Sequence, residues 1–318
     1  MPDRAAPGVS RGAKVTVEVA GRRLGVSNLD KVMYPATETT KGEVLSYYAQ
    51  VAPVLLPLVG RRAVTRIRWP HGVEGPMFFE KNLPSGAPAW LPRVTVSSHG
   101  RDADAHPERD RLTYPLVLDL ADLTYLVNLA SLELHVHQWQ VDADGHPLDP
   151  DRLVIDLDPG SGAGLTECAQ VALWVRPRLA EMGLTTTVPV TSGSKGMQLY
   201  AALPGQHSAD DIRSLAQQLA QEMTKEHPDL VVWRMTKSLR PGKVLLDWSQ
   251  NTAAKTTICP YSLRGKAAPY VAAPRTWHEV EKGAAGKAVL SQLLMDDVLA
   301  RLDEVGDLAA PLVGKRER

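Results

Sequence analysis

Two aspartates, Asp156 and Asp158, stand two residues apart inside the apolar run LVIDLDPG. Side chains of a strand alternate between its faces, so both carboxylates would lie on one face, about 6.5–7 Å apart. Mg²⁺ and Mn²⁺ prefer such hard oxygen ligands, and two ions about 3.5–4 Å apart can share them. The pattern favours a divalent cation site. Its ordinary alternative is two acids on the wet face of an antiparallel strand.

A third carboxylate strengthens the cation hypothesis. Asp247 lies late in another predicted strand, GKVLLDWSQN, on the same face as Lys243 and Ser249. Pairing with a nearby lysine would explain Asp247 alone. A D-x-D strand together with a single aspartate on a second strand is, however, the pattern that a two-metal nucleotidyl-transfer site needs.

A glycine-rich turn and several cations indicate an anionic ligand. The turn Ser192-Gly193-Ser194-Lys195-Gly196 joins two predicted strands and could cradle a triphosphate with its backbone N–H groups. A plain β-hairpin turn fits these residues equally well. Cationic residues flank Asp247 in the sequence and favour binding of an anionic ligand, although a solvated surface also carries such residues. They are Lys237, Arg240 and Lys243 before Asp247, and Lys255, Arg264 and Lys266 after it.

The segment LELHVHQW alternates apolar residues with Glu133, His135 and His137. Ordinary strand polarity explains this alternation. A histidine pair at this spacing could also bind a metal, but no third ligand is evident in the sequence.

Composition narrows the function classes. The 318 residues suit one large domain or two moderate ones. Lys plus Arg and Asp plus Glu each number 36, so the formal net charge is zero. Binding to a nucleic acid would therefore require a local basic patch. Cys168 and Cys259 lack metal-ligand spacing and suggest a reducing cytosol. We expect no signal peptide and no membrane contact, because no stretch approaches the roughly 18 apolar residues of a span.

The elements that must position these residues form a mixed α/β pattern. Apolar spacing predicts a helix over residues 165–182, kinked at Pro177, and a second helix capped by Ser208. Strand runs interleaved with these helices indicate mixed β-sheets. We expect a tail over residues 1–14, one domain over 15–303 and a tail or linker over 304–318. Residues 99–111 resemble an exposed loop, and 141–152 a turn between two strands.

Several stretches together resemble the polymerase domain of bacterial DNA ligase D, a member of the archaeo-eukaryotic primase superfamily, and particularly its mycobacterial and other actinobacterial members. They span roughly residues 24 to 277, and their order and density make the resemblance more specific than any single motif; they are NLDKVMYPATETTK, TRIRWPHGVEGPMFFEK, LELHVHQW, LVIDLDPG, VTSGSKG, MTKSLRPGKVLLDWSQN, KTTICPYSLRG and APRTW. The resemblance implies a primase-type catalytic core of mixed β-sheets flanked by helices.

The resemblance also implies site residues. Asp156, Asp158 and Asp247 would form a catalytic triad that holds two Mn²⁺ or Mg²⁺ ions, with Asp247 on the ion near the primer 3′-hydroxyl. His135 would lie near the incoming sugar. The expected nucleotide-binding residues are His135, Ser192, Lys195, Gln198, Lys237, Arg240, Lys255 and Arg264.

DNA contacts follow from the same resemblance. Phe78 and Phe79 would stack on template bases, since aromatic stacking tolerates any base. A pocket for the 5′-phosphate of a downstream strand would include Asn28, Lys31 and Lys41. The full set of expected DNA-binding residues is Asn28, Lys31, Lys41, Arg66, Arg68, Phe78, Phe79 and Lys81.

The sequence departs from the family at one position. The family motif usually runs Ser-Gly-x-Lys-Gly-Leu-His, whereas here Met197 and Gln198 end it. The histidine is expected to touch the incoming triphosphate, and glutamine can donate a hydrogen bond there without a charge.

We expect a template-dependent polymerase that prefers NTPs and acts on gaps and ends of double-stranded DNA with a 5′-phosphate. Its setting would be bacterial non-homologous end joining, with Ku and a fused or separate ligase, at the nucleoid in the cytoplasm. One alternative is a catalytically weak module that bridges DNA ends. A metal-dependent phosphatase is another, although Pro159 and Gly160 replace the Thr or Val that such enzymes place after D-x-D.

Overall fold

The computed structural model describes residues 14–97 and 111–313. Most of the expected N-terminal tail, most of the expected loop at 99–111 and the last five residues of the expected C-terminal tail lie outside the described residues.

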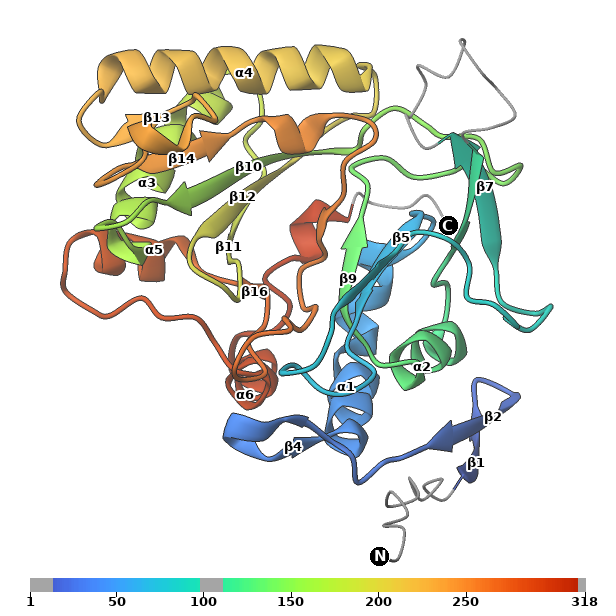
Figure 1. The fold of residues 1–318 in the computed structure, drawn as a ribbon. Coiled ribbons are helices and arrows are strands. Elements are labelled where there is room, and N and C mark those ends of the chain that lie inside the picture. The colour runs from blue at the N-terminus through green and yellow to red at the C-terminus, as the bar shows by residue number, and fades with distance from the viewer. Residues whose placement is uncertain (1–13, 98–110, 314–318) are drawn as a thin grey trace, which may run out of the picture.

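Two β-sheets organise the chain (Figure 1). The larger has six strands, antiparallel except for the parallel pair β13 and β14. In spatial order they are β13 (Val231–Val232), β14 (Val244–Asp247), β10 (Arg152–Pro159), β12 (Met197–Ala202), β11 (Thr187–Thr191) and β16 (Ala273–Pro274). The antiparallel four-stranded sheet runs β15 (Thr257–Ile258), β9 (Ser131–Val136), β5 (Val64–Arg68) and β6 (Phe78–Glu80).

Helices cover one face of the large sheet. Leu153, Ile155 and Leu157 of β10 point into a core with helices α3 (Leu165–Glu181), α4 (Ala209–Glu226) and α5 (Trp277–Ala284). Figure 1 shows these helices on the outer side of that sheet. The other face of β10 carries Val154, Asp156 and Asp158, so the two aspartates point away from the helical layer, as strand alternation predicts.

A second core joins the opposite face of the large sheet to the small sheet. Val154, Val190 and Tyr200 of the large sheet belong to the same apolar cluster as Leu132 and Leu134 of β9. Helices α1 (Lys41–Val59), α2 (Leu120–Asn128) and α6 (Met295–Val305) complete this cluster. The shared core holds the two sheets in a fixed relation, and therefore also the polar residues that each sheet carries.

Short elements complete the chain. Hairpins form from β1 (Lys14–Val19) with β2 (Arg22–Ser27), from β3 (Val32–Tyr34) with β4 (Thr39–Thr40), and from β7 (Arg93–Ser97) with β8 (Arg111–Pro115). Turns of 3₁₀ helix lie at Pro35–Thr37, Lys237–Leu239, Ser249–Asn251 and Ala310–Leu312. Mixed sheets flanked by helices are the architecture that the sequence indicates.

Two of the helices match their sequence predictions. Helix α3 occupies residues 165–181 and passes through Pro177 without ending there. Helix α4 begins after Ser208, whose hydroxyl accepts the Asp211 N–H in the expected capping box. Helices α1, α2, α5 and α6 were not predicted, and three of them, α1, α2 and α6, contribute to the second core.

Helix α1 corrects the expectation that no segment approaches a membrane span, because by length and composition it is long and apolar enough to cross one. In this structure α1 is a core helix. Val51 and Leu55 are fully buried, and the hydroxyls of Tyr47 and Tyr48 donate to the carbonyls of Tyr261 and Leu132. Core helices that never contact a membrane can have the same length and apolar composition.

The C-terminal boundary also differs from the sequence estimate. Helix α6 extends to Val305, beyond the boundary expected at residue 303. Ala309 and Leu312 are then buried in the second core. The residues to 313 therefore pack against the domain and do not form a separate tail.

Candidate active site

The three predicted aspartates meet on the inner face of the large sheet. Asp156 on β10 lies directly opposite Asp247 on β14, in antiparallel register. Asp158 follows two residues later on the same face, opposite Leu245. Strand pairing thus brings Asp247 beside two carboxylates that lie about 90 residues before it in the chain.

The electrostatics of this group favour a cation. Burial raises the pKa of Asp156 to about 7, and the charges of Asp247 and Asp158 add to the rise. Among the described residues, only Arg240 brings a cationic nitrogen within ion-pair distance of these carboxylates, with its Nη1 3.5 Å from Asp158 Oδ2. An oxygen-only donor set with excess negative charge suits a hard divalent ion such as Mg²⁺ or Mn²⁺.

Hydrogen bonds orient Asp247. The backbone N–H and hydroxyl of Ser249 donate to Oδ1 over 2.8 and 2.6 Å, and Gln250 Nε2 donates to Oδ2 over 3.1 Å. The ammonium of Lys255 donates to the Ser249 hydroxyl. Lys255, which is predicted to bind the nucleotide, is thus connected to Asp247 by two successive hydrogen bonds through the Ser249 hydroxyl. Ser249 was predicted only to share a face with Asp247, and Gln250 was not predicted, although both follow Asp247 closely in DWSQN.

The glycine-rich turn lies against the end of β10. A Cβ on Gly196 would come 2.0 Å from the Leu157 carbonyl oxygen, so only glycine permits this approach. Gly193 adopts φ +66°, and a Cβ there would meet Arg264 Cγ at 2.5 Å. Gln292 holds the turn by accepting the Gly193 N–H and donating to the Gly196 carbonyl. Ser192 is nearly buried, and Lys195 is exposed.

Gln198 lies beside the aspartates. It stands opposite Asp156 in the β10–β12 register and is 5% exposed. A hydrogen bond from its side chain lowers the pKa of Asp156, although burial outweighs this effect. Its Oε1 lies 3.0 Å from the hydroxyl of Tyr200, which also contacts the Ile258 carbonyl. The expectation from the motif placed Gln198 toward the triphosphate, whereas in this structure it contacts Asp156.

The two histidines of LELHVHQW have different surroundings. His135 Nε2 lies 2.7 Å from the buried carboxylate of Glu133. His137 instead contacts the Ala63 carbonyl and stacks on Trp139, and burial lowers its pKa to about 4. His137 is therefore a core residue, and the histidines do not form a metal pair.

The predicted phosphate-binding residues lie close together near the start of α1. The ammonium of Lys41 donates to the Ser27 carbonyl and to Asn128 Oδ1, and that of Lys31 donates to the Pro70 carbonyl. Burial lowers the pKa of Lys41 to about 8, and the nearby charge of Lys31 adds to this. Neither lysine has a carboxylate partner among the described ion pairs, so an added anion would be favoured. Asn28 is exposed and its carbonyl accepts the Lys31 N–H.

Strand β6 exposes both phenylalanines, with 46% of Phe78 and 55% of Phe79 accessible. They point to opposite faces, and Phe79 shares the face of Ile67 and, one strand further, Glu133. A cavity of about 680 Å³ beside β6 is lined by Phe79, Lys81 and Arg68 together with Leu83, Leu112 and Leu129. Three of the expected DNA-binding residues therefore line one open cavity.

Arg66 departs from its expected role. Its side chain is fully buried and pairs with Glu80 at 3.1 Å, so it stabilises the β5–β6 pair and presents no charge to a DNA surface. Arg66 lies opposite Leu134, which is buried in the core, and the β5–β9 register shifts only after it, between Ile67 and Arg68. Arg68, near the end of the strand, remains partly exposed and pairs with Glu80 at 2.6 Å.

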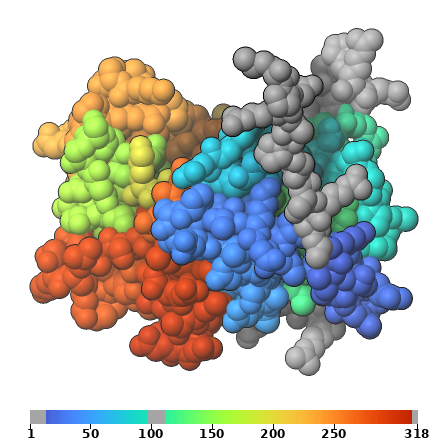
Figure 2. Space-filling model, turned by 60° about the horizontal axis from the view of Figure 1, so that its bottom comes forward, coloured from blue at the N-terminus to red at the C-terminus, as the bar shows by residue number. Residues whose placement is uncertain are grey.

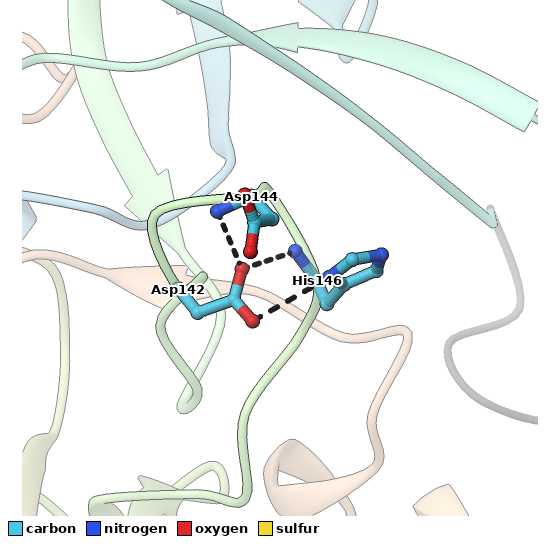
Figure 3. Close-up of side chains that lie close together, drawn as sticks. All are labelled: Asp142, Asp144 and His146. Atoms are coloured by element: carbon cyan, nitrogen blue, oxygen red, sulfur yellow. Dashed lines mark hydrogen bonds and ion pairs between the residues drawn. The ribbon is translucent and has the colours of Figure 1, made fainter.

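A separate cluster in the turn between β9 and β10 has metal-ligand residue types. Figure 3 shows Asp142, Asp144 and His146, whose ligand atoms lie within 4.8 Å of one another. Asp142 Oδ1 accepts the backbone N–H groups of Asp144 and His146, at 2.9 and 2.8 Å. These bonds close the predicted turn, and they account for the clustering of the three side chains.

The chain is similar to proteins of one known family. The family model described as the primase-polymerase domain of LigD matches residues 40–309. The chain is 47% identical over 290 residues to the multifunctional non-homologous end joining protein LigD of Mycolicibacterium smegmatis, covering 91% of this chain and 36% of that protein. It is 33% identical to the bifunctional LigD of Bacillus subtilis, covering 89% of this chain and 43% of that protein.

A solved structure extends the match to three dimensions. The polymerase domain from Mycobacterium tuberculosis ligase D, in complex with DNA, superposes with a TM-score of 0.84 and 46% sequence identity. The match covers 92% of this chain and 99% of that chain. The chain thus spans about a third of the length of its mycobacterial relatives and nearly all of one domain of known structure.

Proposed function

The chain belongs to the LigD primase-polymerase family, and we propose that it is a template-dependent nucleotidyltransferase that fills gaps at broken DNA ends. The observation that carries this proposal is the register of β10 and β14, which sets Asp247 opposite Asp156 with Asp158 on the same face. The match to 99% of a solved polymerase domain supports the same conclusion.

Asp156, Asp158 and Asp247 would hold two divalent cations, Mn²⁺ or Mg²⁺. Bound ions would stabilise the attacking and leaving oxygens of a phosphoryl transfer. The chain's own contribution is to collect the three carboxylates. Burial and mutual repulsion raise the pKa of Asp156 to about 7, so near neutral pH this carboxylate can release its proton when a cation is available.

Nucleotide contacts would come from both sheets. Ser192 and His135 would contact the sugar, and five cations would contact the triphosphate, namely Lys195, Lys237, Arg240, Lys255 and Arg264. Two observations support this role for Arg264: its Cγ lies against Gly193 of the glycine-rich turn, and its charge lowers the pKa of Asp156 against the effect of burial. Arg240 contacts Asp158 and would have to move aside when a cation binds there.

The downstream 5′-phosphate and the template would be bound by residues outside the group of aspartates. Lys31 and Lys41, with Asn28, would bind the 5′-phosphate of a downstream strand through charge-assisted hydrogen bonds. Phe79, Lys81 and Arg68 would contact the template beside β6, where they line one cavity. Arg66 is not part of this proposal, because its charge is buried against Glu80.

The biological setting would be bacterial non-homologous end joining at the nucleoid, in the cytoplasm. Partners would include Ku and a DNA ligase, either on the same polypeptide or on a separate one. The relatives support this setting because their names assign them to non-homologous end joining. A weakly catalytic module that only bridges ends is the alternative, and Gln198 in place of the usual histidine is the feature behind it.

Single-nucleotide incorporation separates the two functions. The substrate is a gapped duplex with a 5′-phosphate on the downstream strand and cytosine as the template base opposite the gap. GTP and Mn²⁺ are added. The proposal predicts templated addition of one guanosine nucleotide. Binding to the gapped duplex without any addition would support the bridging module instead.

A further inference from the structure

Glu133 is a buried carboxylate at the meeting point of residues that the proposed function assigns to different parts of the nucleotide. It lies on β9 between Leu132 and Leu134, which are both in the core. Only 4% of its side chain is exposed. A charge in such a place is costly unless it is paired and hydrogen-bonded, so its contacts indicate why it is there.

Three groups from two segments surround this carboxylate. Oε2 lies 2.7 Å from His135 Nε2, and Oε1 accepts the backbone N–H of Gly265 over 2.9 Å. The guanidinium Nε of Arg264 forms an ion pair with Oε1 at 3.4 Å. Burial raises the pKa of Glu133, but the bond from His135 and the charge of Arg264 more than offset this, so its pKa is below the ordinary value.

The contact with His135 determines which ring nitrogen carries the proton. An ionised carboxylate can only accept, so Nε2 must donate to it. In the neutral imidazole Nδ1 is then an acceptor, and a sugar hydroxyl could donate a hydrogen bond to it. Glu133 therefore selects both the tautomer and the ring orientation of the residue proposed to contact the sugar.

The contact with Arg264 extends to the glycine-rich turn. Arg264 Cγ occupies the space that a Cβ on Gly193 would need. Glu133 on the small sheet is thus connected through Arg264 to the turn between β11 and β12 on the large sheet. The same carboxylate orients a sugar-contacting residue and a triphosphate-contacting residue.

We propose that Glu133 is a positioning residue that aligns His135 and Arg264 as one unit for a nucleoside triphosphate bearing a 2′-hydroxyl. This inference rests on the proposed function, because it names how that same site selects its substrate. Glu133 does not contact the substrate in this account, and it acts through its two neighbours.

The test is the conservative substitution Glu133→Gln. The amide keeps the size of the side chain but offers one acceptor and one donor to neighbours that are all donors. We expect KM for GTP to rise and the preference for GTP over dGTP to fall by about 3- to 10-fold, as the loss of one net hydrogen bond predicts. In a His135→Ala background, Glu133→Gln should leave the GTP:dGTP ratio unchanged, because its route to the sugar is already removed.

A matched control is Glu279→Gln. Glu279 is also a partly buried carboxylate, paired with Arg275 at 3.1 Å and Arg301 at 2.7 Å, but it belongs to helix α5, outside the proposed nucleotide site. This control should leave both KM and the ratio unchanged. If Glu133→Gln retains a normal melting temperature, KM and ratio, the inference is wrong.

A spectroscopic measurement keeps the inference testable if Glu133→Gln does not fold or if the unmodified protein adds no nucleotide. Nitrogen-15 NMR of the unmodified protein should show neutral His135 protonated on Nε2. A dominant Nδ1–H tautomer would overturn the positioning role. Absence of nucleotide addition by the unmodified protein would instead count against the proposed polymerase function alone.

Discussion

Replacing Asp156 by asparagine should inactivate the protein and yet stabilise its metal-free form at alkaline pH. Burial, with repulsion from Asp247 and Asp158, raises the pKa of Asp156 to about 7 from its ordinary value of 3.8. Between these two pH values the folded protein binds a proton that the unfolded chain does not. Stability should therefore fall as pH rises from about 4 to about 7, by about 1.4 kcal/mol per pH unit.

The total loss in the free energy of unfolding between pH 4 and pH 7 approaches about 4 kcal/mol. For a chain of this length, 1 kcal/mol corresponds to about 1.5 °C in melting temperature, so Asp156→Asn should melt about 6 °C above the unmodified protein at pH 8. Toward pH 4 the two proteins should differ little, because protonation of Asp156 in the unfolded chain then begins to match its protonation in the folded chain.

The assay is thermal unfolding from pH 4 to pH 8.5 with a chelator, repeated with Mn²⁺. Mn²⁺ at about 100 times its dissociation constant should raise the free energy of unfolding of the unmodified protein by about 2.7 kcal/mol, and that of Asp156→Asn by much less. Asp303→Asn, on the exposed side of α6, is the control and should follow the unmodified protein. A melting difference that is independent of pH, or equal stabilisation of both proteins by Mn²⁺, would refute the electrostatic reasoning.

Three further outcomes follow from the site. The unmodified protein should bind a gap with a 5′-phosphate more tightly than one with a 5′-hydroxyl, and Lys31→Ala should remove most of the difference; equal affinity of the unmodified protein for both ends would exclude the pocket. Two net hydrogen bonds to the sugar should favour GTP over dGTP by about one to two factors of ten, and Ser192→Ala or His135→Ala should narrow this ratio; a preference for dGTP would overturn the sugar assignment. Gln198→His should shift the Mn²⁺ concentration that gives the half-maximal rate, and by the same factor with GTP as with dGTP, because residue 198 contacts Asp156. A change in the ratio of the GTP rate to the dGTP rate would indicate that residue 198 contacts the sugar instead.

The site could be predicted from the sequence where local rules determine it. Strand alternation places Asp156 and Asp158 on one face whatever the rest of the fold does, and the structure agrees. The sequence also indicated Asp247 as a third carboxylate, late in a second predicted strand, but which strand lies beside β10 depends on long-range pairing that no local pattern contains. The structure adds the register, with Asp247 opposite Asp156.

Other features depend on tertiary contacts that no local pattern contains. Arg66 and Arg68 have the same residue type, lie two positions apart and both pair with Glu80, yet only the tertiary structure shows that the Arg66 side chain is fully buried while 21% of the Arg68 side chain remains exposed. Gln198 illustrates the same limit, because its contact with Asp156 follows from the β10–β12 register. Helix α1 contains Pro53 and Pro57, residues that usually end or kink a helix, and only the structure shows that it continues through both to Val59.

The most direct test of the central claim is single-nucleotide incorporation by the unmodified protein and by Asp158→Ala, on a 5′-phosphorylated gapped duplex with GTP and Mn²⁺. The account predicts addition opposite cytosine by the unmodified protein. It predicts no addition by Asp158→Ala, which should still bind the duplex through its cations and exposed aromatic side chains. Near-normal addition by Asp158→Ala, or no templated addition by the unmodified protein, would contradict the account.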